Sequence, residues 1–579
     1  MKYLKKIRAV QAPIASIQLI ISLTNLLKIL KVYYHPTIHR ATITQQFSIS
    51  INLQPIILTT LTFTLLCHII INKKKGAIKT ALLMGIIIIG YLTLGFEGAL
   101  TIAAILSSII LTEIKQLTYF TLIILSTYEV ISLTYWAIIL PISMKNDLLR
   151  ELATLEYSIY YISSQITPLM TLLILYYWLI TWIIKISLEE IKEKIIQKIR
   201  KEIIIKENEN TSILKINWRI MLIISIIISV ISSIYPYLPS INPNNSPVGV
   251  DIKAYTEMVK EIENDLSKVT IVANGSRPII LLLIYFIWKI SSLNLIEVVK
   301  WMPLILNPML VLSTFYLIDK TTNNREYATL SALITSMGIK ITVNMYSYFL
   351  TNMLALSIIY VAIALLLDSI ERRDRKELLI SIMLASIAIF THPWTFTQFY
   401  VALAFMAFIK LMKNRRLKSV DYEIMFLVIT GVIDVLKEQF IGVGSVRAAS
   451  GTIGRQPFIL NIFNFWGNVI FAFRLLYGGF LSNPILMTLA LIGIYRLEEK
   501  YAFHKYLKNL IFVSSIAFLI ANGSLQSRLI FNLPIEILVA YTLYWISKLK
   551  IHKPIKIAVF IFTLTSTLNY MFKSLANLI

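Results

Sequence analysis

Residues 346–367 read YSYFLTNMLALSIIYVAIALLL, a run without a charged side chain from end to end. An α-helix rises about 1.5 Å per residue and the hydrocarbon core of a bilayer is about 30 Å thick, so a run of this length spans it. Further apolar runs with few or no charges occupy residues 51–71, 220–238, 396–409 and 555–572. Backbone that crosses hydrocarbon must satisfy its own hydrogen bonds, and the alternation typical of barrel strands is missing. The sequence therefore predicts an all-α, polytopic transmembrane bundle.

The composition of the whole chain agrees with this prediction. Of the 579 residues, 57% are hydrophobic and 15% are charged, whereas soluble domains have about 25% charged residues. The formal net charge of +24 would suggest nucleic-acid binding in a soluble protein. Here the basic residues gather in loops, as expected for cytoplasmic loops that fix topology, so we expect no nucleic-acid partner. The single cysteine, Cys67, excludes disulfides within the chain and any cysteine-based metal site.

The distribution of loop charge predicts a topology. Basic residues at positions 2–8 precede the first apolar run, which predicts a cytoplasmic N-terminus, and the basic loops at 73–75, 372–376 and 413–418 fall on the same side. The apolar runs between these loops predict about seventeen spans, among them those at 48–71, 79–95, 98–112, 328–343, 421–437 and 528–546. They also predict two partial or juxtamembrane helices, one of them at 278–292. The loops 239–277 and 438–481 then lie on the outer side. We expect a multi-pass protein of the cell membrane.

Residues 185–219 divide the chain. Their charges are interleaved with isoleucines, which indicates an amphipathic cytoplasmic connector. Before it lies an N-terminal region of six expected helices, residues 1–184, to which we assign no role. After it lies a longer transmembrane module, residues 220–579.

Several charged or titratable side chains fall on the predicted outer side. They are Asp251, Lys253, Glu257, Arg277, His392, Arg447, Arg455 and Arg528. A carboxylate accepts a proton from an acceptor group, and arginines hold a phosphate leaving group through paired hydrogen bonds. The set is therefore suited to group transfer from an anionic, lipid-linked donor.

Each of these side chains also has a structural interpretation. Asp251 alone reads as an exposed loop carboxylate, Arg447 and Arg455 as contacts to lipid headgroups, and His392 as a satisfied histidine at a helix end. Glu129 lies in the middle of an apolar run, where a carboxylate is costly and often functional. For Glu129 we favour pairing with a hydroxyl or a neighbouring helix.

Residues 216–579 resemble the GT-C superfamily of membrane glycosyltransferases, a group similar to protein O-mannosyltransferases, aminoarabinose transferases and the oligosaccharyltransferase catalytic subunit. The matching features are an outer loop with an early acidic residue (Asp251), a helix that starts at Arg277-Pro278, a Thr391-His392-Pro393 turn and a late helix with Arg528 and Pro534. The resemblance implies transfer of a sugar from a polyprenyl- or dolichyl-phosphate donor to a protein or lipid acceptor on the outer face. Asp251 is then the base, and Arg277, Arg447, Arg455 and Arg528 are phosphate-side residues. No cofactor is assigned, and a divalent metal stays open because Asp251 has no close second carboxylate of the Asp-x-Asp kind.

Two other functions remain open from the sequence. A transporter or flippase for a lipid or a small solute places ionisable groups at mid-membrane in broken helices, usually with repeated halves. We find no matching halves in this sequence. The other alternative is a catalytically inactive scaffold of the GT-C kind.

Overall fold

The computed structural model describes residues 2–29, 37–38, 41–42, 54–144, 146–187, 217–445, 469, 484–520, 523–549 and 551–576. Within these residues the regular structure is helical except for one antiparallel pair of short strands, β1 (Thr37–Ile38) and β2 (Ala41–Thr42). The all-α prediction is therefore confirmed. The expected connector at 185–219 falls largely outside the described residues, which end at 187 and resume at 217.

The chain divides into two compact units. The first comprises Met1–Ile166 with Ile551–Asn569, and the second comprises Thr167–Lys550 with Tyr570–Ile579. The first unit contains α1 (Lys2–Ile29), α2 (Gln54–Leu111), α3 (Ile114–Thr134), a π-helical turn η1 (Tyr135–Ile139), a 3₁₀ turn η2 (Leu140–Ile142) and parts of α4 (Asp147–Ser187) and α24 (Lys553–Ala576).

The helix α2 does not run straight. Residues 57–65 near its start and 100–111 near its end share one buried cluster, although a straight helix would separate residues 57 and 103 by about 70 Å. Thr64 and Ser107 both hydrogen-bond to Gln18 of α1, and His68 Nδ1 lies 3.0 Å from the carbonyl oxygen of Leu111. The two arms of α2 therefore run in the same direction, so the chain reverses twice between them. The three spans expected at 48–71, 79–95 and 98–112 are not confirmed as such, because the two arms, Gln54–His68 and Glu97–Leu111, are apolar helices shorter than 18 residues.

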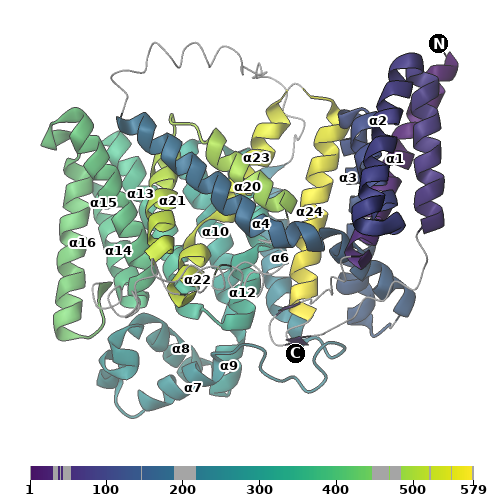
Figure 1. Cartoon of the computed structure of the whole chain (residues 1–579). Coiled ribbons are helices and arrows are strands. Elements are labelled where there is room, and N and C mark those ends of the chain that lie inside the picture. Colours follow the sequence, from purple (N-terminus) through teal and green to yellow (C-terminus); the bar gives the residue numbers. More distant parts are fainter. Residues whose placement is uncertain are drawn as a thin grey trace. The chain divides into compact units, whose positions relative to one another are not determined.

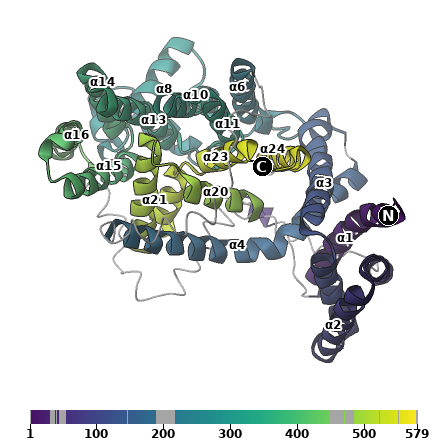
Figure 2. The ribbon, with the colours of Figure 1, turned by 90° about the horizontal axis from the view of Figure 1, so that it is seen from above.

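The second unit holds most of the helices. They are α6 (Trp218–Ile234), α7 (Ile252–Glu261), α8 (Pro278–Ser291), α9 (Leu295–Trp301), α10 (Pro303–Thr322), α11 (Arg325–Ser336), α12 (Ile339–Ser347), α13 (Leu350–Arg372), α14 (Arg375–Thr391), α15 (Pro393–Asn414), α16 (Asp421–Phe440), α20 (Pro484–Arg496), α21 (Ala502–Ile520), α22 (Gly523–Asn532) and α23 (Ile535–Lys548). Short 3₁₀ turns connect some of them: η3 (Tyr235–Tyr237), η4 (Leu266–Thr270), η5 (Val272–Gly275) and η6 (Leu417–Ser419). The most buried of the long helices is α13, which packs against α10 and α14 (Figure 2).

The helices α13 to α16 lie side by side and alternate in direction (Figure 1). Near the start of α13, Thr351 lies 3.2 Å from the Tyr255 hydroxyl of α7, and the helix ends at Arg372 about 30 Å further along its axis. The next helices return to His392, run back to Asn414 and return again to Phe440. The basic turns at 372–376 and 413–418 therefore lie at the end of this unit opposite to the 249–277 segment.

Seven helices within the described residues are long and apolar enough to cross a membrane, or eight if one bent pair counts as a span. They are Gln116–Ile142, Thr167–Ile184, Trp218–Tyr237, Leu295–Thr322, Leu350–Arg372, Pro393–Asn414 and Lys553–Ala576, and the bent pair is Gln526–Asn532 with Ile535–Lys548. The expected total of about seventeen spans is not confirmed. Some apolar runs that read as single spans are broken, at Gly338 between α11 and α12 and at Pro534 between α22 and α23. With 14 residues, α8 is too short to span, as expected for a juxtamembrane helix.

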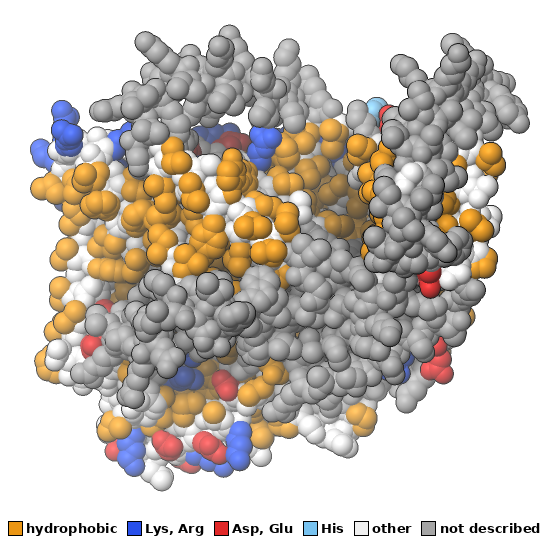
Figure 3. Space-filling view, in the orientation of Figure 1, with side chains coloured by type: hydrophobic (Ala, Val, Ile, Leu, Met, Phe, Trp, Pro, Cys, Tyr) orange, Lys and Arg blue, Asp and Glu red, His pale blue; other side chains and the backbone are white. Residues whose placement is uncertain are grey.

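The exposed surface of α6 is that of a helix in lipid. Ile220, Ile223 and Ile227 are half or more exposed, whereas Ser225 and Ser229 on the opposite side are fully buried. Water would favour the reverse arrangement, while lipid favours apolar side chains outside and small residues at helix contacts. In the second unit, Figure 3 shows a broad apolar band between two charged ends, over α13–α16 above and α7–α8 below. These features support the interpretation of a multi-pass membrane protein.

Candidate functional site

Asp251 is held at the start of α7 by contacts from the α12–α13 junction. The amide of Val250 donates to the carbonyl oxygen of Tyr346 (2.9 Å), and a Cβ on Gly249 would fall 1.8 Å from the ring of Tyr348. Only a residue without a side chain can approach this ring so closely. The carboxylate of Asp251, half-buried, accepts no hydrogen bond from the helix that it caps. It is therefore available to a ligand.

Arg277 is the second side chain of the site, and it lies over Tyr255. Its guanidinium carbon is 5.6 Å from the centre of the buried Tyr255 ring, and its Nη1 is 3.5 Å from the Tyr255 hydroxyl. Such a cation–ring contact is worth about 0.5–2 kcal/mol. The Nε atom of Arg277 is buried and has no hydrogen-bond partner within the described part of the chain. A buried N–H of this kind is costly unless a ligand or water accepts from it.

The segment before Arg277 packs against the start of the 438–481 loop. Val443 donates its amide hydrogen to the carbonyl oxygen of Asn274 (2.8 Å). Gly275 has a φ of +63° and Gly442 a φ of +147°, conformations that favour glycine. A Cβ on Gly442 would fall 2.1 Å from the Asn274 oxygen. The two backbones therefore touch, and this contact fixes the position of Arg277.

Arg528 comes from a distant part of the sequence, on α22. Its guanidinium lies 5.4 Å from the ring centre of Trp394, in the first turn of α15. The side chain is half-buried and forms no salt bridge with a carboxylate of the described residues. Arg528 is thus oriented by an aromatic ring and keeps its hydrogen-bond donors for another partner.

Electrostatic interactions join these three side chains. Burial raises the pKa of Asp251 above the usual range, and the charges of Arg277 and Arg528 oppose this shift. Neither arginine approaches Asp251 closely enough to form a salt bridge. Two guanidinium groups and one carboxylate leave a net positive charge, which suits an anionic ligand.

His392 lies in the same electrostatic field, and its ring caps a helix. The amide of Thr395 donates to His392 Nδ1 (3.2 Å), and the Thr395 hydroxyl is 2.8 Å from the same atom. Nδ1 is then an acceptor, which leaves the proton of the neutral ring on Nε2. Burial lowers the pKa of His392 well below its usual value, and the charges of Arg528, Arg277 and Lys437 act in the same direction. His392 is thus a helix-end histidine whose Nδ1 is satisfied by Thr395, as its structural interpretation expected.

Lys437 of α16 is a neighbour that the sequence interpretation missed. Its buried ammonium donates to the carbonyl oxygens of Ile389 (3.0 Å) and Val443 (2.9 Å). One turn earlier, the carboxylate of Asp434 accepts from the amide of Ser445 (3.1 Å). The two side chains thus hold the start of the 438–481 loop against α16. The available signal was a pair of charges near the end of the expected span at 421–437.

The other predicted site residues do not join this cluster. Lys253 and Glu257 are 88% and 62% exposed on α7 and lie 3.9 Å apart as an i,i+4 pair. An exposed pair of this kind contributes at most about 1 kcal/mol and marks a hydrated surface. Arg447 and Arg455 lie outside the described residues.

In the first unit, Glu129 has the partner expected from a neighbouring helix. Asn569 of α24 donates to the Glu129 carboxylate (2.6 Å), and its amide oxygen accepts from Ser132 (2.8 Å). All three side chains are buried. This network satisfies the hydrogen bonding of a carboxylate within an apolar helix, where an unpaired carboxylate would be costly.

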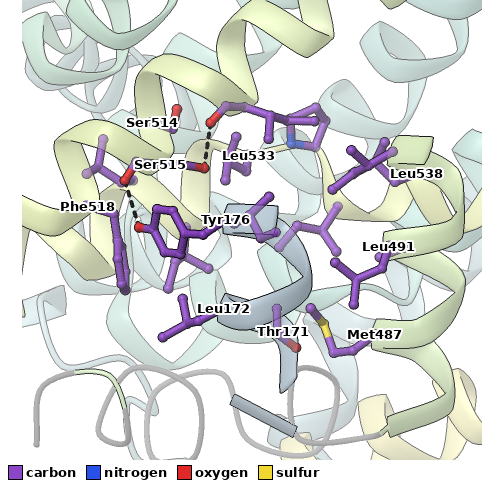
Figure 4. Close-up of a pocket in the computed structure, with 18 residues that line it drawn as sticks. Thr171, Leu172, Tyr176, Met487, Leu491, Ser514, Ser515, Phe518, Leu533 and Leu538 are labelled. Atoms are coloured by element: carbon purple, nitrogen blue, oxygen red, sulfur yellow. Dashed lines mark hydrogen bonds between the residues drawn. The ribbon is translucent and has the colours of Figure 1, made fainter. Parts of the chain in front are cut away.

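An apolar pocket lies in the second unit, beside the bend between α22 and α23 (Figure 4). Its walls come from α4, α20, α21 and the bend, and they include Leu172, Met487, Leu529 and Leu533. The Tyr176 hydroxyl on its lining already donates to the carbonyl oxygen of Ser515 (2.9 Å). The pocket is therefore suited to hydrocarbon.

Within the described residues, no three His, Cys, Asp or Glu side chains gather in a way that suits a metal ion. Four segments of the chain contribute to the charged cluster of Asp251, Arg277, His392 and Arg528. The net charge of the cluster is positive. No protein-family model matches the chain, and a search of curated proteins found no significant match.

Proposed function

We propose that the protein is a membrane glycosyltransferase that moves a sugar from a polyprenyl- or dolichyl-phosphate donor to a protein or lipid acceptor at the outer face. The acceptor hydroxyl or amide attacks the anomeric carbon, and the bond from that carbon to the phosphate oxygen breaks. Asp251 takes the acceptor proton, and the polyprenyl phosphate leaves with the electron pair. Arg277 and Arg528 neutralise the phosphate, together with Arg447 and Arg455 of the long loop.

One observation carries this proposal. A half-buried carboxylate lies in the field of two arginines, neither of which is ion-paired with it, at one end of a helical bundle of the membrane type. If these charges had only a structural role, the carboxylate and an arginine would be in direct contact as an ion pair. An open set with an unsatisfied Arg277 Nε instead fits a ligand that carries negative charge.

The apolar pocket supports a lipid-linked donor. Leu529, which lines the pocket, follows Arg528 directly on α22. A single helix therefore presents a cation to the charged cluster and apolar side chains to the pocket. A molecule with a phosphate head and a hydrocarbon chain suits both surfaces.

The direct test is Asp251→Asn, assayed with purified protein, a polyprenyl-phosphate sugar and candidate acceptors. Removing a general base lowers turnover by about 10²–10⁴-fold, while donor binding should stay within about threefold of the original protein. Asp265→Asn is the matched control, because Asp265 belongs to the same outer segment, is exposed and caps only η4. Full turnover in Asp251→Asn would remove this residue as the base.

A transporter remains the second candidate, because two broken helices meet inside the second unit. The α11–α12 break and the α22–α23 break are joined by a buried ion pair, Lys340 with Glu536. Discontinuous helices with ionisable groups occur at the binding sites of many transporters. Solute or lipid uptake into vesicles that contain the purified protein, with no donor binding, would favour this function over glycosyl transfer.

A further inference from the structure

Lys340 and Glu536 form an ion pair in the interior of the second unit. Their Nζ and Oε2 atoms are 2.6 Å apart, and each side chain is 1% exposed. The pair lies outside the charged cluster, and the proposed reaction does not use it. Buried ion pairs add little stability compared with apolar side chains of the same size, so stability alone does not account for it. Ionisable residues of this kind in membrane bundles commonly mark a function.

The pair is located at a break between two helices. Pro534 has no amide hydrogen and separates α22 from α23, which are bent by 41°. Lys340 Nζ donates to the carbonyl oxygen of Leu533 (2.7 Å), next to the proline. Its partner Glu536 lies in the first turn of α23. Lys340 therefore holds both sides of the bend at once.

A second break provides the room for this contact. Between α11 and α12, a Cβ on Gly338 would fall 2.5 Å from Glu536 Cγ and 2.8 Å from Glu536 Oε1. The amide of Lys340 also points to Glu536 Oε1 at 3.4 Å. The glycine thus brings the start of α12 directly against the start of α23, and the ion pair joins the two.

The bend determines the direction of α22, which carries Arg528. At its other contacts, α22 is tied to α15: Gln398 donates to the Leu529 carbonyl oxygen (3.2 Å), and Asn532 donates to Gln398 (2.9 Å). α15 also supplies Trp394, on which Arg528 lies. Arg528 and the bend are connected by the last turn of α22. A change of the bend angle would therefore move Arg528 relative to Trp394 of α15.

We propose that Lys340 and Glu536 are positioning residues that lock the α22–α23 bend and thereby hold Arg528 at the anion site. The inference rests on the proposed function only for the identity of the anion. The lock itself is a property of the bundle.

The test replaces the pair by apolar side chains of similar size, Lys340→Met with Glu536→Leu, so that folding is retained. Binding of farnesyl phosphate to the purified protein is measured by calorimetry, in the original protein and in an Arg528→Ala background. We expect the double replacement to raise the Kd about tenfold or more, as for loss of a charge-assisted contact, and to have no further effect once Arg528 is absent. Lys410→Met with Glu423→Leu is the matched control, because that pair (2.7 Å) lies near the other end of α15.

A second measurement does not depend on a ligand. Hydrogen exchange of the amides in 526–535 should become faster in the Lys340→Met, Glu536→Leu protein, while exchange in α13 and the melting temperature stay unchanged. If the double replacement does not fold, Glu536→Gln takes its place, because it keeps the shape of the pair. It should give a smaller increase in the exchange rate. If exchange and Kd are unchanged, or if the Kd effect persists without Arg528, the positioning role is wrong. If the original protein does not bind farnesyl phosphate, the proposed function fails, and the exchange measurement still decides the lock.

Discussion

At the scale of single residues, the site depends on a carboxylate that is neither exposed nor paired. Burial raises the pKa of Asp251, while Arg277 and Arg528 moderate the shift without closing on the carboxylate. A raised pKa makes the ionised carboxylate a stronger base, which favours proton transfer from an acceptor. His392, which lies in the field of the same two arginines, adds no charge, because its pKa is lowered well below its usual value.

This arrangement predicts a pH dependence. Asp251 acts only when ionised, so kcat/KM should rise with pH through the raised pKa of Asp251 and level off above it. Arg528→Gln removes one charge that lowers this pKa, so the acidic limb of the profile should move to higher pH as well as to lower rates. Measurement of kcat/KM between pH 4 and pH 9 checks this. An acidic limb at the same pH in both proteins would assign the titration to another group.

At the scale of elements, loops and helix ends hold the site together through close backbone contacts. The contact of Gly442 with Asn274 joins the start of the 438–481 loop to the segment that leads into Arg277. Lys437 and Asp434 fix the same loop to α16. The position of Arg277 is therefore set by contacts with residues more than 150 positions later in the chain.

Replacement of Gly442 by alanine should disturb this contact. The added Cβ would fall 2.1 Å from the Asn274 carbonyl oxygen, in a backbone conformation with φ of +147°. Strain of this kind costs about 1–3 kcal/mol, so we expect a lower melting temperature and weaker donor binding. Gly431→Ala is the control, since its Cβ would meet only the hydroxyl end of Tyr400, at 2.9 Å. Equal effects of the two replacements would show that the Gly442 contact does not set the position of Arg277.

The apolar runs predicted where helices form but not where they break. Most of the run at 346–367 lies in α13 (Leu350–Arg372), but its first residues end α12, and Tyr348, with a φ of +55°, separates the two helices. The run at 528–546 was expected as one span, yet Pro534 and the Lys340 contact divide it. The contact of the Lys340 ammonium with this break joins segments that are distant in the sequence. The hydropathy of a single run therefore cannot predict it.

The candidate site was predictable only in outline. Alternation of helix direction indicated that Asp251, Arg277, His392 and Arg528 share one end of the bundle. The ring contacts of Tyr255 and Trp394, and the role of Lys437, depend on side-chain geometry between distant segments. Lys253 and Glu257 are close to Asp251 in sequence, but the periodicity of α7 turns them towards solvent.

At the scale of the whole molecule, the charged ends of the second unit predict opposite sides of a membrane. In a Cys67→Ser background, Lys253→Cys and Lys418→Cys place one thiol at each exposed end. A membrane-impermeant maleimide applied to intact cells should label residue 253 and leave residue 418 unlabelled until the cells are permeabilised. Labelling of both thiols from the same side would contradict the orientation and the outer location of the site.

The contact between Glu129 and Asn569 has a consequence for biogenesis. The two residues are 440 positions apart in the chain. At about 5–20 residues per second, synthesis of the intervening chain takes roughly 20–90 s. Throughout that interval α3 exists without the amide that holds its carboxylate. The first unit therefore acquires this contact only after α24 has been made, 440 residues after Glu129.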